Sequence, residues 1–203
     1  LGSADGKGLK LIICHLGNGS SLSAVKDGKC VDTSMGLTPL EGVLMGTRSG
    51  DIDPAAIPYL MKKLNMTAEE TVTFLNKKCG VLGVSELSSD FRDLEKAAEE
   101  GNEKAITART MFCYRIKKYI GAFAAALGGV DVIAFAGGVG ENDGGVREEC
   151  VKGLEFLGAK MDPSTNDIRG KEALISTPDS KVKVAVIPTN EELAICRETV
   201  ALV

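Results

Sequence analysis

The chain contains 203 residues, with 24 glycines, one histidine and a formal net charge of −4 at neutral pH. About 200 residues suit one ordinary domain, and such a chain buries a core without disulfides or a structural metal. Hydrophobic residues make up 44% and charged residues 26%, which disfavours a disordered tail or a coiled coil. The sequence has no apolar run of membrane-spanning length, no secretory signal and no basic cluster, so we expect neither membrane insertion nor nucleic-acid binding.

The six cysteines are scattered, and no two of them form a CxxC pair. One histidine cannot complete a zinc site with them. Scattered cysteines of this kind are typical of reduced intracellular proteins, so we expect a cytoplasmic location. Because the first residue is Leu1 and not methionine, we expect the chain to be a piece of a longer one.

The first predicted elements form a small antiparallel meander. An apolar run over 9–14 is typical of a buried strand, and the glycine-rich stretch 15–20 predicts a turn after it. Residues 21–26 alternate between apolar and polar side chains, which indicates a second strand. Asp27-Gly28 predicts another turn, and residues 30–33 resume as a strand.

Helices are expected in the middle of the chain. The sequence Thr38-Pro39-Leu40-Glu41 matches a capping box with proline at the first helical position, and therefore predicts a helix start. Asp53 is expected to cap a helix that runs to about residue 64. A second capping box, formed by Thr67 and Glu70, predicts a helix that ends near residue 78.

Residues 91–100 indicate a short helix, and residues 103–127 predict the longest helix of the chain. Gly128-Gly129 is expected to end that helix. The evidence for it is a set of apolar residues at helical spacing: Met111, Phe112, Ile116, Ile120, Phe123 and Leu127.

The last third of the sequence alternates strands and helices. A strand is predicted over 131–136, a second glycine-rich turn over 137–142, a helix over 145–157 and a strand over 181–187. Thr189 and Glu192 predict a capping box for a final helix. Without a linker or repeat, this order indicates one α/β domain with a mixed sheet flanked by helices.

Two glycine-rich turns follow apolar strands, at 15–20 and 137–142. Either they are plain turns, or their backbone N–H groups approach a phosphate. The dinucleotide-binding fingerprint fits neither, because Leu22 and Asp143 stand where it requires glycine. The glycine–lysine segment before the first strand has the wrong spacing and position for a P-loop. A Rossmann enzyme and a P-loop NTPase are therefore disfavoured.

Arg48 lies between Gly46 and Gly50, on a loop where its guanidinium is free to bind phosphate or carboxylate oxygens in a bidentate manner. The alternative interpretation is a surface arginine paired with Asp51 or Asp53. Both interpretations remain open from the residues alone.

Glu191 and His15 are the other candidates for chemistry. With Thr189 as the N-cap, Glu192 would close the capping box, so Glu191 is the freer carboxylate for a metal ion. An acidic residue in a first helical turn also simply complements the helix dipole. His15 is either a satisfied core histidine or, beside the first glycine-rich turn, a donor to phosphate oxygens.

Six motifs stand in a fixed order along the chain: His15-Leu-Gly-Asn-Gly-Ser-Ser, Thr38-Pro-Leu-Glu-Gly, Met45-Gly-Thr-Arg-Ser-Gly, Asp90-Phe-Arg-Asp, Gly137-Gly-Val-Gly-Glu-Asn and Ile187-Pro-Thr-Asn-Glu-Glu. Together they resemble the C-terminal half of the acetate kinase (acetokinase) family. The resemblance covers essentially the whole chain. It implies that residues 1–203 are the C-terminal nucleotide-binding domain of a two-domain enzyme. The implied fold is the ribonuclease H-like, actin-like ATPase fold of the sugar kinase, Hsp70 and actin superfamily.

The resemblance also implies roles for individual residues. The nucleotide phosphates would be held by His15, Leu16, Gly17, Asn18 and Gly19. Adenosine would lie between one wall made of Asp90, Phe91 and Arg92 and another made of Gly138, Val139, Gly140, Glu141 and Asn142. Arg48 would contact the transferring phosphoryl group and the acetyl substrate. Glu191 would help hold Mg²⁺, or Mn²⁺ in its place.

The implied reaction is a reversible, in-line transfer of phosphoryl from ATP to acetate, which gives ADP and acetyl phosphate for acetyl-CoA biosynthesis. A homodimer is implied as well. The catalytic aspartate and other essential groups of the family belong to its N-terminal half, so the isolated chain is expected to be inactive as a kinase. The alternatives are a propionate or butyrate kinase of the same family, and a non-catalytic dimerisation module that keeps the nucleotide fold.

Overall fold

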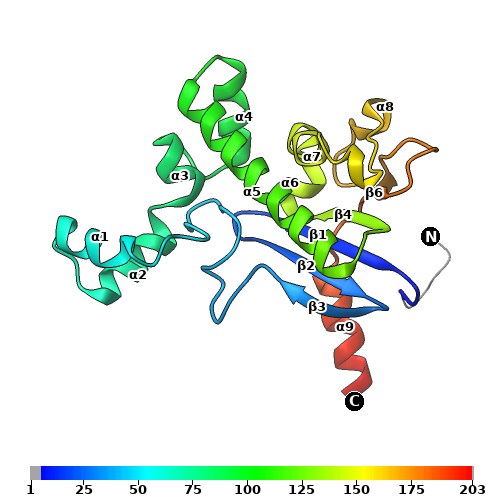
Figure 1. The fold of residues 1–203 in the computed structure, drawn as a ribbon, viewed down its shortest axis with the longest axis horizontal. Helices are drawn as coiled ribbons and strands as arrows, with labels where there is room; N and C mark the ends of the chain where they lie inside the picture. The colour runs from blue at the N-terminus through cyan, green and yellow to red at the C-terminus, as the bar shows by residue number, and fades with distance from the viewer. Residues whose placement is uncertain (1–5, 203) are drawn as a thin grey trace.

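The computed structural model describes residues 6–202. Within that range, six strands form one sheet in the order β3-β2-β1-β4-β6-β5 (Figure 1). Their bounds are β1 (Lys10–Leu16), β2 (Ser20–Lys26), β3 (Lys29–Thr33), β4 (Val132–Ala136), β5 (Ala173–Leu174) and β6 (Lys183–Val186). β1, β2 and β3 pair antiparallel, whereas β1, β4 and β6 pair parallel. The mixed sheet confirms the predicted fold class.

The parallel pairing brings three distant parts of the sequence to one edge of the sheet. His15 near the end of β1 pairs with Ala136 of β4, and Phe135 pairs with Val186 of β6. The segments that follow these strands therefore start side by side. In open α/β sheets the carboxyl edge of parallel strands is where ligands bind.

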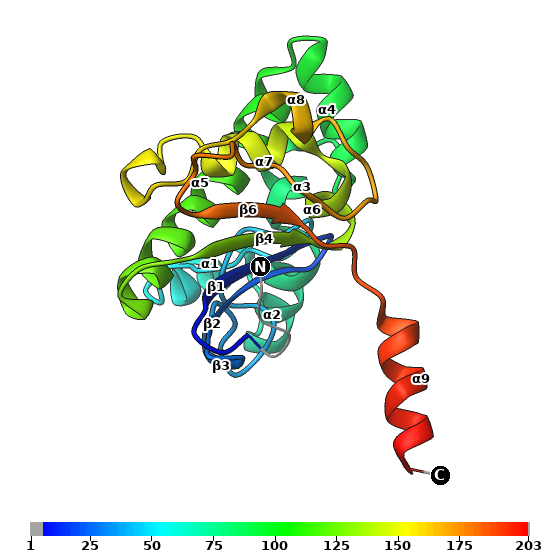
Figure 2. The same ribbon diagram turned by 90° about the vertical axis from the view of Figure 1, so that its right-hand side faces the viewer.

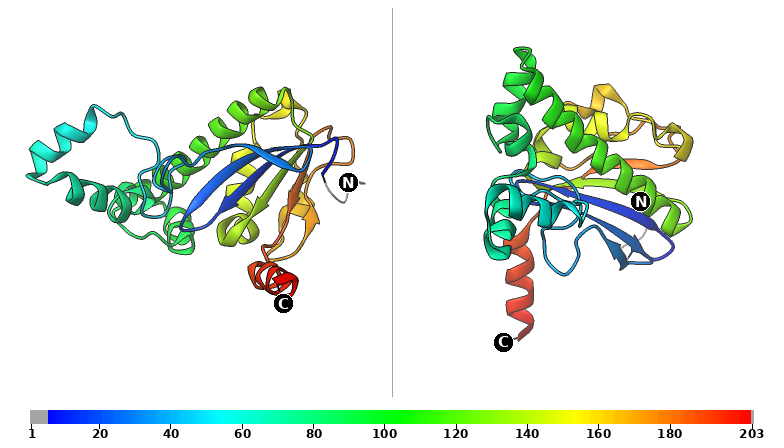
Figure 3. Two further views of the ribbon diagram at one scale, coloured as in Figure 1. Left: turned by 90° about the horizontal axis from the view of Figure 1, so that it is seen from below. Right: turned by 60° about the vertical axis from the view of Figure 1, so that its left-hand side comes forward.

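The α-helices of the described range lie beside this sheet or project from it, and Figures 1 and 2 show their arrangement. They are α1 (Ala56–Leu64), α2 (Ala68–Lys77), α3 (Gly80–Ser85), α4 (Phe91–Glu99), α5 (Glu103–Leu127), α6 (Gly137–Asn142), α7 (Gly144–Val151), α8 (Pro163–Asn166) and α9 (Glu191–Leu202). The α1–α2 pair projects from one side of the molecule, and α9 projects from another (Figure 3). Of the described helices, none is long and apolar enough to cross a bilayer.

Helix α5 has the predicted bounds and forms the centre of the core. Asn102 caps its start, because the side-chain oxygen accepts hydrogen bonds from the next turn, and Gly128 ends it in a left-handed conformation. Its buried residues join the core, where the helix contacts β1 and β2 as well as α3, α4 and α7. Met111 does not join them and is 41% exposed. It lies one residue, or about 100° of helix rotation, from the buried Phe112.

The helix predicted from residue 38 is absent, and residues 38–41 form turns instead. Gly42 has a φ of +113°, which a right-handed helix cannot include. Its N–H donates to Oδ1 of Asp51 at 2.9 Å, which holds the chain as a closed loop. The helix predicted from the capping-box pattern is therefore wrong. The hydrogen bond between Gly42 and Asp51, nine residues apart, holds this segment in a loop instead.

Three further boundaries differ from the prediction. β1 continues to Leu16, so His15 belongs to a strand and not to a turn. Residues 137–142 form the helix α6 where a turn was expected, and α7 ends at Val151 instead of near residue 157. Gly153 has a φ of +88°, which prevents continuation of that helix.

The final helix begins as expected, but its cap is a different residue. Oδ1 of Asn190 accepts a hydrogen bond from Leu193 N at 3.0 Å, so Asn190 is the N-cap. Thr189 instead donates through N and Oγ1 to Oε1 of Glu141, at 3.0 and 3.1 Å. The predicted capping box of Thr189 and Glu192 is therefore wrong. Glu191 and Glu192 occupy the first two positions of α9.

Candidate functional site

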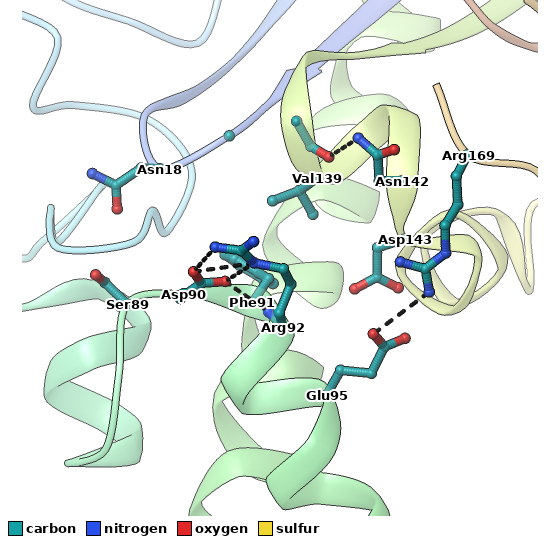
Figure 4. Close-up of a pocket in the computed structure, with 12 residues that line it drawn as sticks. Asn18, Ser89, Asp90, Phe91, Arg92, Glu95, Val139, Asn142, Asp143 and Arg169 are labelled. Carbon is teal, nitrogen blue, oxygen red and sulfur yellow. Dashed lines mark hydrogen bonds and ion pairs between the residues drawn. The ribbon is translucent and has the colours of Figure 1, made fainter. Parts of the chain in front are cut away.

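A pocket of about 620 Å³ opens between the start of α4, helix α6 and the loop after β1 (Figure 4). It lies beside the carboxyl edge of the parallel strands. Its lining consists of Gly17, Asn18, Ser89, Asp90, Phe91, Arg92, Glu95, Gly138, Val139, Asn142, Asp143 and Arg169. A cavity of this size accommodates a nucleotide-sized ligand.

The first wall is the start of α4. Asp90 caps the helix and accepts hydrogen bonds from N and Nε of Arg92, at 2.9 and 3.0 Å. The side-chain and then the backbone hydrogen bonds from Arg92 lower the pKa of Asp90 to about 2. Phe91 turns inward and packs its ring against Phe112 with centroids 4.5 Å apart. The wall therefore offers a fixed ion pair above an apolar floor.

The second wall is α6, which approaches β1 very closely. Gly137 has a φ of +77°, and a Cβ there would lie 2.7 Å from Leu16 O, so only glycine fits. The Glu141 carboxylate accepts hydrogen bonds from Gly137 N and from Thr189. One side chain thus joins the start of α6 to the segment that leads into α9.

A buried ion pair beneath the pocket connects its two walls. Arg109 of α5 donates to both carboxylate oxygens of Asp143, at 2.8 and 3.1 Å, and their side chains are only 16% and 8% exposed. Arg109 also reaches the backbone oxygen of Phe91 at 3.5 Å. Asp143 in turn caps α7 through Val146 N. The pair fixes the start of α4 relative to α7.

A second arginine, Arg147, is completely buried beside α6. It donates to Gly140 O, to Asn166 Oδ1 and O, and to Ile168 O, at distances between 2.6 and 3.0 Å. These bonds attach the segment after α8 to the α6 wall. All four acceptors are neutral oxygens, three of them in the backbone, so this guanidinium fixes the backbone of α6 relative to that of the segment after α8.

A second hollow of about 520 Å³ lies beyond Gly138, at the same edge of the sheet. It is lined by His15, Gly137, Gly138, Thr189, Asn190, Glu191 and Glu192. Among residues 6–202, no group of three or more His, Cys, Asp and Glu side chains is arranged to enclose a metal ion. Mg²⁺ usually keeps several waters and binds one or two carboxylates together with substrate phosphates. A hollow lined by the carboxylates of Glu191 and Glu192 is suited to this mode of Mg²⁺ binding.

Arg48 lies against the loop after β1. A Cβ placed on Gly19 would be 3.1 Å from Nη1 of Arg48. The guanidinium donates to Pro39 O at 3.3 Å and contacts Met45 Sδ at 3.7 Å. It pairs with neither Asp51 nor Asp53, so the alternative interpretation of Arg48 as a surface ion-pair partner is wrong.

The loop that carries Arg48 is bonded to four other elements. Gly46 N donates to Asn18 O, and a Cβ on Gly46 would collide with the Asn18 side chain. Ser49 N and Thr47 Oγ1 donate to the last turn of α2, and the start of α3 donates to Met45 O and Gly46 O. Asp51 makes the fourth attachment, to α5, through Arg115 and Tyr119, both at 2.9 Å.

The Asp51 contact predicts an unusual tyrosine titration. Burial, and then the hydrogen bond to Asp51, raise the pKa of Tyr119 to about 12. The neutral hydroxyl stabilises the fold fully below the unfolded pKa of about 10, and this stabilisation is lost as pH rises through about 12. The chain has three tyrosines and no tryptophan, so absorbance at alkaline pH reports them directly. We expect one late-titrating tyrosine that disappears in Tyr119→Phe. A late step that survives this substitution would contradict the assignment.

Most of the residues expected at the site gather around the two hollows. Gly17, Asn18, Asp90, Phe91, Arg92, Gly138, Val139 and Asn142 line the larger one, and His15 and Glu191 line the smaller one. Five of the expected residues line neither hollow. Gly19 and Arg48 lie against each other. Leu16 is fully buried in the core, Gly140 faces Phe135 and Cys14, and Glu141 uses its carboxylate to join two loops.

Arg109, Asp143, Arg147 and Arg169 were missed in the sequence. A signal existed for two of them. Arg109 falls on the apolar stripe of α5, four residues after Ala105 and three before Phe112, where an unpaired charge is too costly. Asp143 directly before Gly144-Gly145 has the pattern of a helix N-cap. Arg169 lies in an irregular segment, and nothing in the sequence places it near the pocket.

Comparison with known proteins identifies the lineage of this site. The family model described as the acetokinase family matches residues 3–197. The chain belongs to the acetokinase family. The acetate kinase of Phocaeicola vulgatus is 62% identical over 98% of this chain and 50% of that protein. The crystal structure of Porphyromonas gingivalis acetate kinase superposes with a TM-score of 0.94 at 50% identity, covering 98% of this chain and 50% of that one.

A second solved structure shares the fold. A propionate kinase from Francisella tularensis superposes with a TM-score of 0.85 at 39% identity, over 91% of this chain and 47% of that one. The chain spans about half the length of the relatives that it matches. The expected actin-like ATPase fold is confirmed by these superpositions.

Proposed function

We propose that residues 1–203 form the C-terminal nucleotide-binding domain of an acetate kinase, which transfers the γ-phosphoryl group of ATP reversibly to acetate. The observation that carries the proposal is the pocket between Asp90–Arg92 and Gly138–Asn142, in a chain of the acetokinase family. Arg48 lies beside Gly19, at one end of the loop that follows β1. The hollow lined by Glu191 lies near the other end, where it is also lined by His15 of β1.

Each group has a task that its position supports. Adenosine lies between the Asp90–Arg92 wall and the α6 wall, and the phosphates extend toward Gly17–Gly19. His15 donates to phosphate oxygens, and Arg48 neutralises charge on the transferring group. Glu191 would help hold Mg²⁺, or Mn²⁺ in its place, which would supply positive charge to the same oxygens. Phosphoryl transfer depends mainly on such positioning and charge neutralisation.

The proposal extends to the assembly and its location. We propose a homodimer, for which the projecting α1–α2 pair offers exposed apolar side chains at Tyr59, Leu64 and Val72. We also propose a cytoplasmic location, because six scattered cysteines without a CxxC pair are typical of proteins in a reducing compartment. Sedimentation of the purified protein tests the first proposal, and cell fractionation tests the second.

A second candidate substrate is supported by the likeness to a propionate kinase. The two activities differ only in the acyl chain of the acceptor. Comparing kcat/KM of the intact protein for acetate, propionate and butyrate separates them. The highest kcat/KM for acetate supports an acetate kinase. The highest kcat/KM for propionate or butyrate makes that acid the proposed substrate instead.

The proposal is tested with two preparations. We expect the intact protein to form acetyl phosphate from acetate and Mg-ATP, and the isolated chain to bind Mg-ADP without measurable turnover, because half of the catalytic groups lie outside it. Calorimetry measures the binding, and hydroxamate formation measures the product. An intact protein that binds nucleotide without turning over any short acid would be a non-catalytic module. An isolated chain that turns over at the intact rate would contradict the division of the site.

A further inference from the structure

Arg169 lines the nucleotide pocket although no motif of the sequence contains it. Its side chain comes from the segment between α8 and β5 and is 65% exposed. In Figure 4 it lies on the opposite side of the pocket from Asn18, with Asp143 and Glu95 nearby. Arg169 is therefore remote from the loop that we propose for the phosphates.

The backbone on both sides of Arg169 is fixed to the α6 wall. On one side, Ile168 O accepts a hydrogen bond from the fully buried Arg147 at 3.0 Å. On the other, Gly170 N donates to Glu141 O at 3.2 Å. An exposed side chain on an anchored backbone has a defined position without a large ordering cost on binding.

Within residues 6–202, the exposed guanidinium of Arg169 has one ion-pair partner. Asp143, which caps α7, is engaged by two hydrogen bonds from Arg109. Glu95 of α4 is the ion-pair partner of Arg169, with Nη2 and Oε2 3.9 Å apart. This ion pair connects the α4 wall to the segment after α8. Its N–O distance is too long for a hydrogen bond.

We infer that Arg169 closes the base end of the pocket and stacks its guanidinium on the purine, with Glu95 as the residue that positions it. The inference rests on the proposed nucleotide function and adds a residue that binds the base. A guanidinium is planar, weakly hydrated and suited to stacking on aromatic faces. Val139 and Phe91 supply apolar surface in the same pocket. The phosphate charge would lie at the Asn18 side, so the base is the part of the nucleotide within reach of Arg169.

Calorimetry on this chain with adenosine, Mg-ADP and inorganic pyrophosphate tests the inference. We expect Arg169→Ala to weaken adenosine and Mg-ADP alike, by about tenfold, and to leave pyrophosphate unchanged. Arg169→Lys keeps the charge without the planar face, so it should lose most of the same affinity. Glu95→Gln should cost a smaller factor of about three, because it removes only the positioning partner.

Arg197→Ala, on the exposed face of α9, is the matched control and should change none of the three affinities. Because Arg169 is exposed, its variants should unfold at the temperature of the unsubstituted chain. An unchanged adenosine affinity in Arg169→Ala overturns the inference. So does a loss confined to Mg-ADP and pyrophosphate, which would make Arg169 a phosphate ligand. If the unsubstituted chain binds none of the probes, the proposed nucleotide site fails and this inference fails with it.

Discussion

Replacing Arg48 with alanine in the intact protein is expected to lower kcat by about 10³ or more, with little change in nucleotide affinity. The guanidinium lies beside Gly19, at the phosphate end of the proposed site, and not in the adenosine walls. An arginine at that position would stabilise the negative charge on the phosphoryl group while it is transferred. Steady-state kinetics, together with calorimetry for Mg-ADP, measures both quantities.

Two variants define what the Arg48 result means. Arg48→Lys keeps one positive charge without the planar fork, so we expect an intermediate kcat. Arg197→Ala removes an arginine of α9 that is outside both hollows and should keep the original rate. An unchanged kcat in Arg48→Ala would limit this residue to its contacts with Pro39 and Met45.

Replacing Asp143 with alanine is expected to reduce the free energy of unfolding by about 3–5 kcal/mol. The substitution leaves the guanidinium of Arg109 unpaired in a site where its side chain is only 16% exposed. It also removes the cap of α7. Urea denaturation of this chain, followed by circular dichroism, measures the change.

The matched control is Asp179→Ala, because Asp179 makes an equally short ion pair with Lys160 on the exposed surface. Water and salt screen such a pair, so we expect little measurable change in stability. Asp143→Asn should fall between the two, since an amide oxygen can still cap α7. If Asp143→Ala is no more destabilising than Asp179→Ala, the Arg109–Asp143 pair does not hold the pocket walls together.

Local sequence patterns correctly predicted helices whose ends are determined by contacts between neighbouring residues. The stripe on residues 103–127 predicted α5 with the right bounds, and Thr67 with Glu70 predicted the start of α2, where the capping box is present. The pattern at Thr38–Glu41 was of the same kind and failed. There the deciding contacts, Gly42 with Asp51 and Arg48 with Pro39, join residues that are nine apart in the sequence.

The candidate site divides in a similar way. Asp90, Phe91, Arg92 and most of residues 138–142 were expected at the site only through the resemblance of their motifs to the acetokinase family, and the structure brings them to one pocket. The residues that hold the walls in place also make long-range bonds: Arg109 and Asp143 are 34 positions apart, and Arg147 and Asn166 are 19 apart. No pattern of neighbouring residues encodes such pairs, since they exist only after the sheet has brought α5, α6 and α8 together.

The four attachments of the Arg48 loop have a thermodynamic consequence. Ordering a loop costs conformational entropy, and here that cost is met during folding, when the Arg48 loop is bonded to the loop after β1 and to α2, α3 and α5. An incoming phosphate then meets a backbone that is already in place and must order only one side chain. More of the interaction free energy is consequently available to the transition state. Under the proposed function, the last turn of α2 would thereby contribute to the rate through Leu75 O and Asn76 O, although neither residue lines the nucleotide pocket.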